Sequence, residues 1–136
     1  MQTESIVIPE IIHNEMVENC KDRLPYEACG LLSGTGNRIR SLWQLENELK
    51  SATRFFVSKQ SVEKTIQNIK HLEEQVLAIY HTHPITDPVP SSYDLRNHTD
   101  EKVFMVIISF KTNPPITKWY TIKGNHYTER LFSIES

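Results

Sequence analysis

Two histidines separated by one residue, His81 and His83, are the side chains whose types and spacing best suit metal chemistry. Pro84 follows them, and it stops a strand and favours extended backbone at the residue before it. In extended backbone, residues i and i+2 point to the same side, so the two imidazoles can converge on one ion. Two imidazoles suit Zn²⁺, with Zn–N distances of about 2.0–2.1 Å, but a third protein ligand is needed. Asp87 and Asp94 are the candidates for that ligand.

Simpler roles for these residues stay open. A histidine pair at a strand end is compatible with a partly solvated polar surface, and Ser91 and Asp94 have the spacing of residues that cap a helix. Other site motifs are absent from the sequence, which contains no HExxH, no PCxxC and no GxSxG. Cys29 can serve as a thiol nucleophile beside a histidine, but it lies in an apolar run, where an unreactive buried thiol is expected. His98 and His126 have no partner at metal-binding spacing and are expected at the surface.

The hydrophobic pattern predicts a mixed α/β or α+β fold in which helices cover a largely antiparallel sheet. Gly34–Asn37 is predicted as a hairpin loop, and Gly124–Asn125 as a turn. The run from Val103 to Phe110 has the continuous apolar pattern of a strand buried on both faces. Helices are predicted at residues 9–22, 59–74 and 92–100, and strands at residues 5–8, 28–33, 38–45, 54–57, 76–80, 103–110, 116–122 and 127–132.

Length and composition predict a single domain that covers residues 1–136. The 15 basic and 17 acidic residues give a net charge of −2, which argues against binding to nucleic acid or to a membrane surface. Two cysteines do not make a disulfide framework. The segment Met1–Met16 lacks the basic start of a signal peptide, and no apolar run is long enough to span a membrane. A cytoplasmic protein with reduced thiols is therefore expected.

Three separated motifs, in this order, resemble those of the JAMM/MPN-domain zinc metalloproteases of the compact prokaryotic kind. They are Glu27 in the segment PYEACGLLSG, the segment His81-Thr82-His83-Pro84, and the segment Pro90-Ser91-Ser92-Tyr93-Asp94. Asn47 followed by Arg54-Phe55 is similar to the central segment of the family. The resemblance covers almost the whole chain. It implies the cytidine-deaminase-like JAMM/MPN fold, an α+β fold whose curved mixed sheet is flanked by helices.

The resemblance also implies a role for each of five residues. His81, His83 and Asp94 would bind Zn²⁺, and a water molecule would take the fourth, open position. Glu27 would act on that water as general base and then donate the proton to the leaving amine. Ser91 would stabilise the oxyanion of the tetrahedral intermediate.

The family further suggests a substrate with a β-grasp, ubiquitin-like fold that ends in Gly-Gly, such as a bacterial sulfur carrier. The enzyme would cleave the amide bond that follows Gly-Gly, and the segment 46–56 is a candidate edge for pairing with the substrate tail. Two alternatives stay open: a peptidase for a different small isopeptide, and a non-catalytic scaffold for protein docking. Scaffold members of the family usually lack one of the ligands, whereas all five site positions are intact here.

Overall fold

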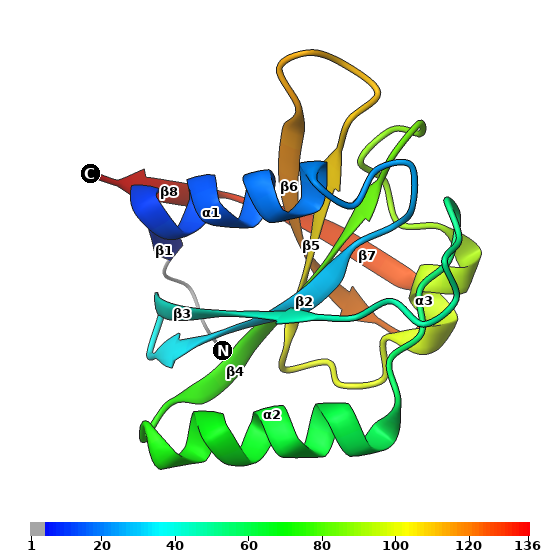
Figure 1. Cartoon of the computed structure of the whole chain (residues 1–136). Coiled ribbons are helices and arrows are strands. Elements are labelled where there is room, and N and C mark those ends of the chain that lie inside the picture. The colour runs from blue at the N-terminus through cyan, green and yellow to red at the C-terminus, as the bar shows by residue number, and fades with distance from the viewer. Residues whose placement is uncertain (1–4) are drawn as a thin grey trace.

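An eight-stranded sheet forms the centre of the molecule (Figure 1). The computed structural model describes residues 5–136, and residues 1–4 of the expected domain 1–136 lie outside the described residues. In chain order the elements are β1 (Ile6–Pro9), α1 (Glu10–Lys21), β2 (Cys29–Thr35), β3 (Arg38–Leu45), α2 (Lys59–His71), β4 (Gln75–His83), α3 (Ser92–Asn97), β5 (Phe104–Ser109), β6 (Ile116–Lys123), β7 (His126–Arg130) and β8 (Phe132–Glu135).

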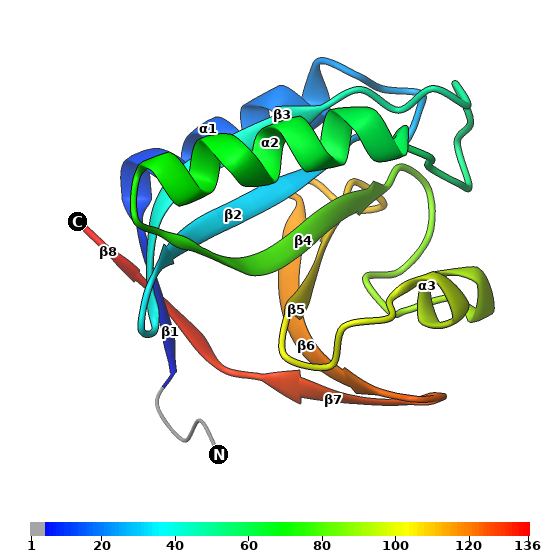
Figure 2. The same ribbon diagram turned by 90° about the horizontal axis from the view of Figure 1, so that it is seen from below.

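The sheet is mixed and runs in the order β7-β6-β5-β4-β2-β3-β1-β8. β2 pairs antiparallel with β3 and β4, and β6 pairs antiparallel with β5 and β7. β4 lies parallel to β5, and β1 lies parallel to both β3 and β8. The sheet is strongly curved, and α1 and α2 lie on opposite faces of its β2–β3–β4 part (Figure 1 and Figure 2). The predicted α+β fold with a mixed sheet flanked by helices is therefore confirmed.

The helices follow the predicted periodicity but end earlier than predicted. α1 begins directly after Pro9, which lacks the backbone N–H that a first turn would leave unpaired. α2 begins after Ser58, whose side chain accepts a hydrogen bond from Ser61 N, and it ends at His71. Shortly beyond that end, Glu73 has a left-handed φ of 59°, so the helical backbone cannot continue to residue 74. Within residues 5–136, no helix is long and apolar enough to cross a membrane.

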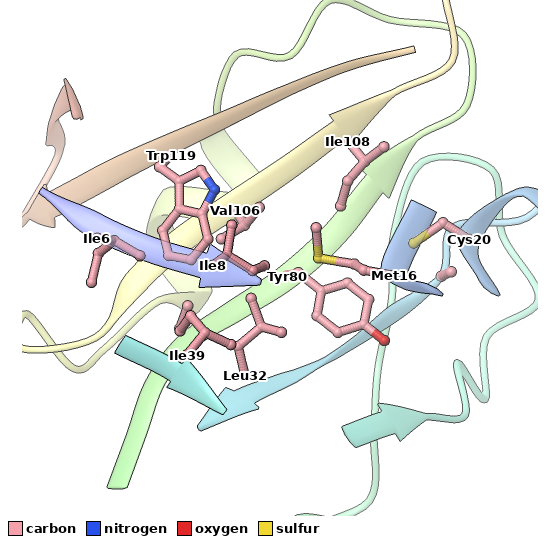
Figure 3. Close-up of a cluster of buried hydrophobic side chains, with 12 residues drawn as sticks. Ile6, Ile8, Met16, Cys20, Leu32, Ile39, Tyr80, Val106, Ile108 and Trp119 are labelled. Atoms are coloured by element: carbon pink, nitrogen blue, oxygen red, sulfur yellow. The ribbon is translucent and has the colours of Figure 1, made fainter. Parts of the chain in front are cut away.

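The main hydrophobic core lies between α1 and the sheet (Figure 3). Met16 of α1, Leu32 of β2 and Tyr80 of β4 belong to this cluster and are almost fully buried. Tyr80 packs so closely on β2 that a Cβ atom at Gly30 would overlap its side chain. Because side chains alternate along a strand, His81, the neighbour of Tyr80, faces the opposite side of the sheet.

The predicted strand at residues 54–57 is wrong. These residues form an irregular connection between β3 and α2. The side chain of Asn47 accepts from Phe56 N and donates to Arg54 O, so part of the backbone that a strand ladder would use is already bound. The connection is therefore held by a side chain rather than by a neighbouring strand.

The end of the chain forms two strands where the pattern predicts one strand at residues 127–132. The break falls at Leu131, which is 82% exposed. β7 pairs with β6 at one end of the sheet, whereas β8 pairs with β1 at the other end. Residues 126–135 therefore link the two ends of the curved sheet (Figure 2).

Candidate metal centre and active site

The end of β4 carries two histidines on one face of the sheet. His81 and His83 alternate with Thr82, which points to the opposite face and is fully buried. Ala28 N donates to Thr82 Oγ1 at 2.8 Å, and Thr82 N donates to Ala28 O at 3.0 Å. Thr82 therefore fixes the strand end that carries the histidines to the residue that follows Glu27.

His81, His83 and Asp94 form a group of three buried side chains whose nitrogen and oxygen atoms converge. Nε2 of His81 and Nε2 of His83 are 3.3 Å apart, and each lies 3.1 Å from Oδ2 of Asp94. Tetrahedral zinc with bonds of about 2.0–2.1 Å holds its ligand atoms ~3.3 Å apart. The donor set and its spacing therefore fit a zinc ion that keeps one position open, as catalytic zinc sites do.

His83 is oriented by a hydrogen bond from its other ring nitrogen. Its Nδ1–H donates to the carbonyl oxygen of Asp87 at 2.8 Å, which leaves Nε2 of the neutral ring unprotonated. Such a bond fixes the tautomer of a metal-binding histidine. The Asp87 carboxylate forms an exposed ion pair with Lys111 at 3.1 Å. Of the two aspartates considered from the sequence, the structure brings Asp94 to the histidines, and Asp87 contributes its backbone.

Asp94 carries the negative charge of the group. Burial on its own raises the pKa of this carboxyl, but hydrogen bonds with His81, His83 and the N–H of Ser91 hold the pKa well below its usual range. Burial also works to lower the pKa of His83, but its hydrogen bonds to Asp94 and Asp87 outweigh burial and raise the pKa. One carboxylate between two imidazoles is thus an environment that favours a cation.

The start of α3 places Asp94. Ser91 is the N-cap residue: its Oγ accepts from Asp94 N at 3.0 Å, and Ser91 N donates to Asp94 Oδ2 at 2.9 Å. This reciprocal pair is a capping box, the simpler role that the spacing of the two residues also predicts. Ser91 is exposed, and among residues 5–136 its hydroxyl oxygen acts as an acceptor, so its proton can be donated to a ligand.

Glu27 lies just before β2 and is only 3% exposed. Its Oε1 is buried and has no hydrogen-bond partner within the described part of the chain. Burial, together with the negative charge of Asp94, raises the pKa of Glu27 to about 8, although the charge of His83 opposes the shift. A buried carboxyl with one oxygen left free in this part of the chain, within electrostatic reach of the metal-binding group, has the environment of a general base.

A cavity of about 220 Å³ adjoins the histidines on the α2 side of the sheet. His81 and Asp94 form part of its wall, and Phe55 stacks on the His81 ring with 5.1 Å between ring centroids. The rest of the wall is mostly apolar and includes Leu31, Leu45, Phe56, Val57, Val62, Ile79 and Met105. The Phe55 contact was not predicted, and the only sequence signal for it is the Arg54-Phe55 pair in the family resemblance.

Two other residues line the same cavity. Cys29 pairs with His81 across β2 and β4, and burial raises its pKa to about 12, as expected for an unreactive thiol. The prediction that His98 lies at the surface is wrong. It is buried, and its Nε2–H donates to Val103 O at 2.7 Å, because the loop after α3 folds back onto the start of β5.

Comparison with known proteins assigns the family. Residues 9–122 match the prokaryotic homologues of the JAB domain, and the chain belongs to this family. It is similar to the desampylase of Pyrococcus furiosus, with 28% identity over 109 residues that cover 80% of this chain and 76% of that protein. It is also similar to the CysO-cysteine peptidase of Mycobacterium tuberculosis, with 27% identity over 106 residues, 76% of this chain and 73% of that protein.

A solved structure shows the same fold. The solution structure of a protein from Desulfitobacterium hafniense superimposes with a TM-score of 0.86 and 26% identity. The superposition covers 96% of this chain and 93% of that protein. The predicted resemblance to a compact prokaryotic JAMM/MPN domain is thereby confirmed.

Proposed function

We propose that this protein is a zinc-dependent peptidase or isopeptidase that hydrolyses an amide bond at the C-terminal Gly-Gly of a ubiquitin-like sulfur carrier. The observation that carries the proposal is the buried group of His81, His83 and Asp94 within electrostatic reach of Glu27, whose Oε1 has no hydrogen-bond partner in residues 5–136. Membership of the JAB family and the similarity to a desampylase and to a CysO-cysteine peptidase support the same assignment.

The three converging donor atoms would hold the zinc ion: Nε2 of His81, Nε2 of His83 and Oδ2 of Asp94. A bound zinc ion supplies a Lewis acid, which polarises a carbonyl group and lowers the pKa of a coordinated water to about 7. His83 and Asp94 are oriented from behind by the carbonyl of Asp87 and the N–H of Ser91. Both partners are backbone groups, so the orientation of the ligand side chains does not depend on other, mobile side chains.

Glu27 would move the proton during the reaction. Its Oε1 has no hydrogen-bond partner among the described residues, so it can accept a proton from the attacking water. The buried carboxyl would then hold that proton, shielded from solvent, until the leaving amine takes it. The Ser91 hydroxyl would donate to the substrate oxygen as negative charge develops there, a contribution of roughly 3–4 kcal/mol for one such donor.

A tail that ends in Gly-Gly suits a narrow approach to the site, because residues without side chains pass where others clash. Residues 46–56, the segment predicted as a pairing edge, would flank the tail but could not add it as a paired strand, because the side chains of Asn47 and Ser51 already bind much of the segment's backbone. Two residues of this segment, Phe55 and Phe56, line the cavity beside His81. The tail would therefore lie next to the metal-binding group.

The experiment that tests this function uses zinc-loaded protein and a sulfur carrier extended by one residue past Gly-Gly, with cleavage followed by mass spectrometry. Glu27→Gln should keep its zinc and its fold but lose most turnover, because an amide cannot accept the proton. Ser91→Ala should lose less, on the order of a hundredfold. Glu18→Gln, on the exposed side of α1, is the matched control and should cleave like the unchanged protein.

Cleavage by Glu27→Gln at the unchanged rate would refute the proposed mechanism. A zinc-loaded protein that binds the carrier but never cleaves it would favour the scaffold alternative. Cleavage of other small isopeptides, without cleavage of the carrier, would favour the second alternative.

A further inference from the structure

The side chain of Asn47 organises the connection between β3 and α2. Its carboxamide makes four hydrogen bonds, all with backbone groups. Nδ2 donates to Glu27 O at 2.9 Å and to Arg54 O at 3.0 Å. Oδ1 accepts from Leu49 N at 3.0 Å and from Phe56 N at 3.1 Å. The two N–H groups and two acceptor positions of the amide are thus all used.

Glu27 depends on this connection for both of its backbone polar groups. Its N–H donates to Ser51 O at 2.7 Å, and its carbonyl accepts from Asn47. Residues 22–26, which precede it, are exposed, and β2 begins only at Cys29. The connection therefore binds the polar backbone groups of Glu27 itself, whereas those of the next residue, Ala28, are bound by Thr82 of β4.

The far end of the same connection contacts the metal-binding group. The Phe55 ring stacks on His81 with an interplanar angle of 26°. The Phe55 carbonyl accepts from Tyr93 Oη at 3.3 Å, and Tyr93 precedes Asp94 in α3. Asn47 thus lies between two attachments, one to the proposed general base and one to the proposed ligands.

We propose that Asn47 is a positioning residue that sets where the Glu27 carboxylate lies relative to His81 and Asp94. It would act through backbone hydrogen bonds and would not touch substrate or metal. Glu27 has no side-chain partner on Oε1 within the described residues, so its position depends on how its backbone is held. The inference rests on the proposed function, because the turnover of that reaction is one of its readouts.

The substitution Asn47→Asp separates the role of the amide oxygen from that of the amide nitrogen. Asn47→Asp keeps the oxygen that accepts from Leu49 and Phe56, and it loses both N–H donors, including the one to Glu27. Asn47→Ala loses all four bonds and tests the whole connection, at a greater risk to folding. Asn68→Asp is the matched control, since Asn68 is exposed on α2.

The experiment measures kcat, KM and zinc content for each variant, together with the NMR shifts of the His81 ring protons, which report the Phe55 stack. Asn47→Asp should lower kcat about 10- to 100-fold, as expected when a reacting group is displaced by ~1 Å. Its KM, its zinc content and its His81 shifts should stay unchanged. Asn68→Asp should match the unchanged protein in every measurement.

Unchanged kcat in Asn47→Asp would overturn the proposal. So would a rise in KM alone, which would assign the connection to substrate binding, or a loss of zinc, which would assign it to the ligands. Hydrogen exchange of the Glu27 amide separates this proposal from the proposed function. If the unchanged protein cleaves no Gly-Gly substrate, faster Glu27 exchange in Asn47→Asp still supports the tether, and unchanged exchange refutes it.

Discussion

Asp94 uses one carboxylate oxygen for several contacts at once. Oδ2 lies 3.1 Å from Nε2 of both histidines and accepts the Ser91 N–H at 2.9 Å. A carboxylate oxygen has enough lone-pair capacity for such sharing, so capping a helix and binding a cation do not exclude each other. The two roles that the sequence allows for Asp94 are both compatible with the same geometry.

The first prediction concerns the third ligand. Asp94→Ala should strongly reduce zinc content, because it removes the carboxylate oxygen that lies 3.1 Å from Nε2 of both histidines. It should also cost about 1 kcal/mol of stability through the lost capping box. Asp87→Ala should keep its zinc, since Asp87 contributes a backbone carbonyl. Plasma mass spectrometry would measure the zinc content of both variants. Loss of zinc in Asp87→Ala but not in Asp94→Ala would identify Asp87 as the third ligand.

The second prediction concerns the cysteines. Burial raises the pKa of Cys29 to about 12 and that of Cys20 still further above its usual range. Folded protein at pH 8 should therefore resist alkylation by iodoacetamide, and both thiols should react after denaturation, as counted by mass spectrometry. Rapid labelling of the folded protein would contradict this expectation.

The same shifts make stability depend on pH. An unfolded thiol loses its proton near a pKa of about 8.5, whereas the buried Cys29 thiol keeps its proton up to about pH 12. Between these values the folded state binds more protons, so the free energy of unfolding should fall as the pH rises. Urea unfolding at pH 8, 9 and 10 would measure the slope, and Cys29→Ala should make it shallower.

At the level of the elements, the sequence predicts those strands and turns that depend only on neighbouring residues. The hairpin of β2 and β3 and the buried strand β5 follow from alternation, turn residues and apolar runs, and all are observed. His81 and His83 share a face for the same reason. The sequence does not predict β8 as a separate strand, because its partner β1 lies at the other end of the chain and the residues next to β8 do not indicate this pairing.

The rest of the site depends on contacts between distant segments. Glu27 by itself is an acid before an apolar run, and only the family resemblance predicts its role. The stacking of Phe55 on His81 and the four bonds of Asn47 arise when the connection folds over β2 and β4, which no periodicity encodes. The single domain spanning residues 1–136 stays a prediction.

The third prediction concerns the close contact between β2 and β4. A Cβ atom at Gly30 would overlap the Tyr80 side chain and the backbone oxygen of Trp43, so Gly30→Ala should destabilise the fold by about 1–3 kcal/mol. Tyr80→Phe should cost little, because the Tyr80 hydroxyl is buried with no partner among the described residues. Urea unfolding would measure both changes. An unchanged midpoint for Gly30→Ala would contradict the prediction, because it would mean that the neighbouring atoms make room for the methyl group at no cost in stability.

At the level of the whole molecule, the proposed substrate must bring an extended tail to a site built from buried residues. Changing the penultimate glycine of the carrier tail to valine should abolish cleavage, because a branched side chain would block the narrow approach. An unstructured chain such as casein should be cleaved little. Cleavage rates measured by mass spectrometry on the Gly and Val tails test this, and equal rates would favour a general peptidase.

The parallel pairing of β8 with β1 has a consequence for how the chain folds as it is made. β1 emerges from the ribosome early, and its neighbour on one side is β3, but its other neighbour is β8. Synthesis proceeds at about 5–20 residues per second, so the outer edge of β1 stays unpaired for seconds while the rest of the sheet assembles. A nascent chain stalled before β8 should expose that edge to chaperones, and release of β8 should end the interaction.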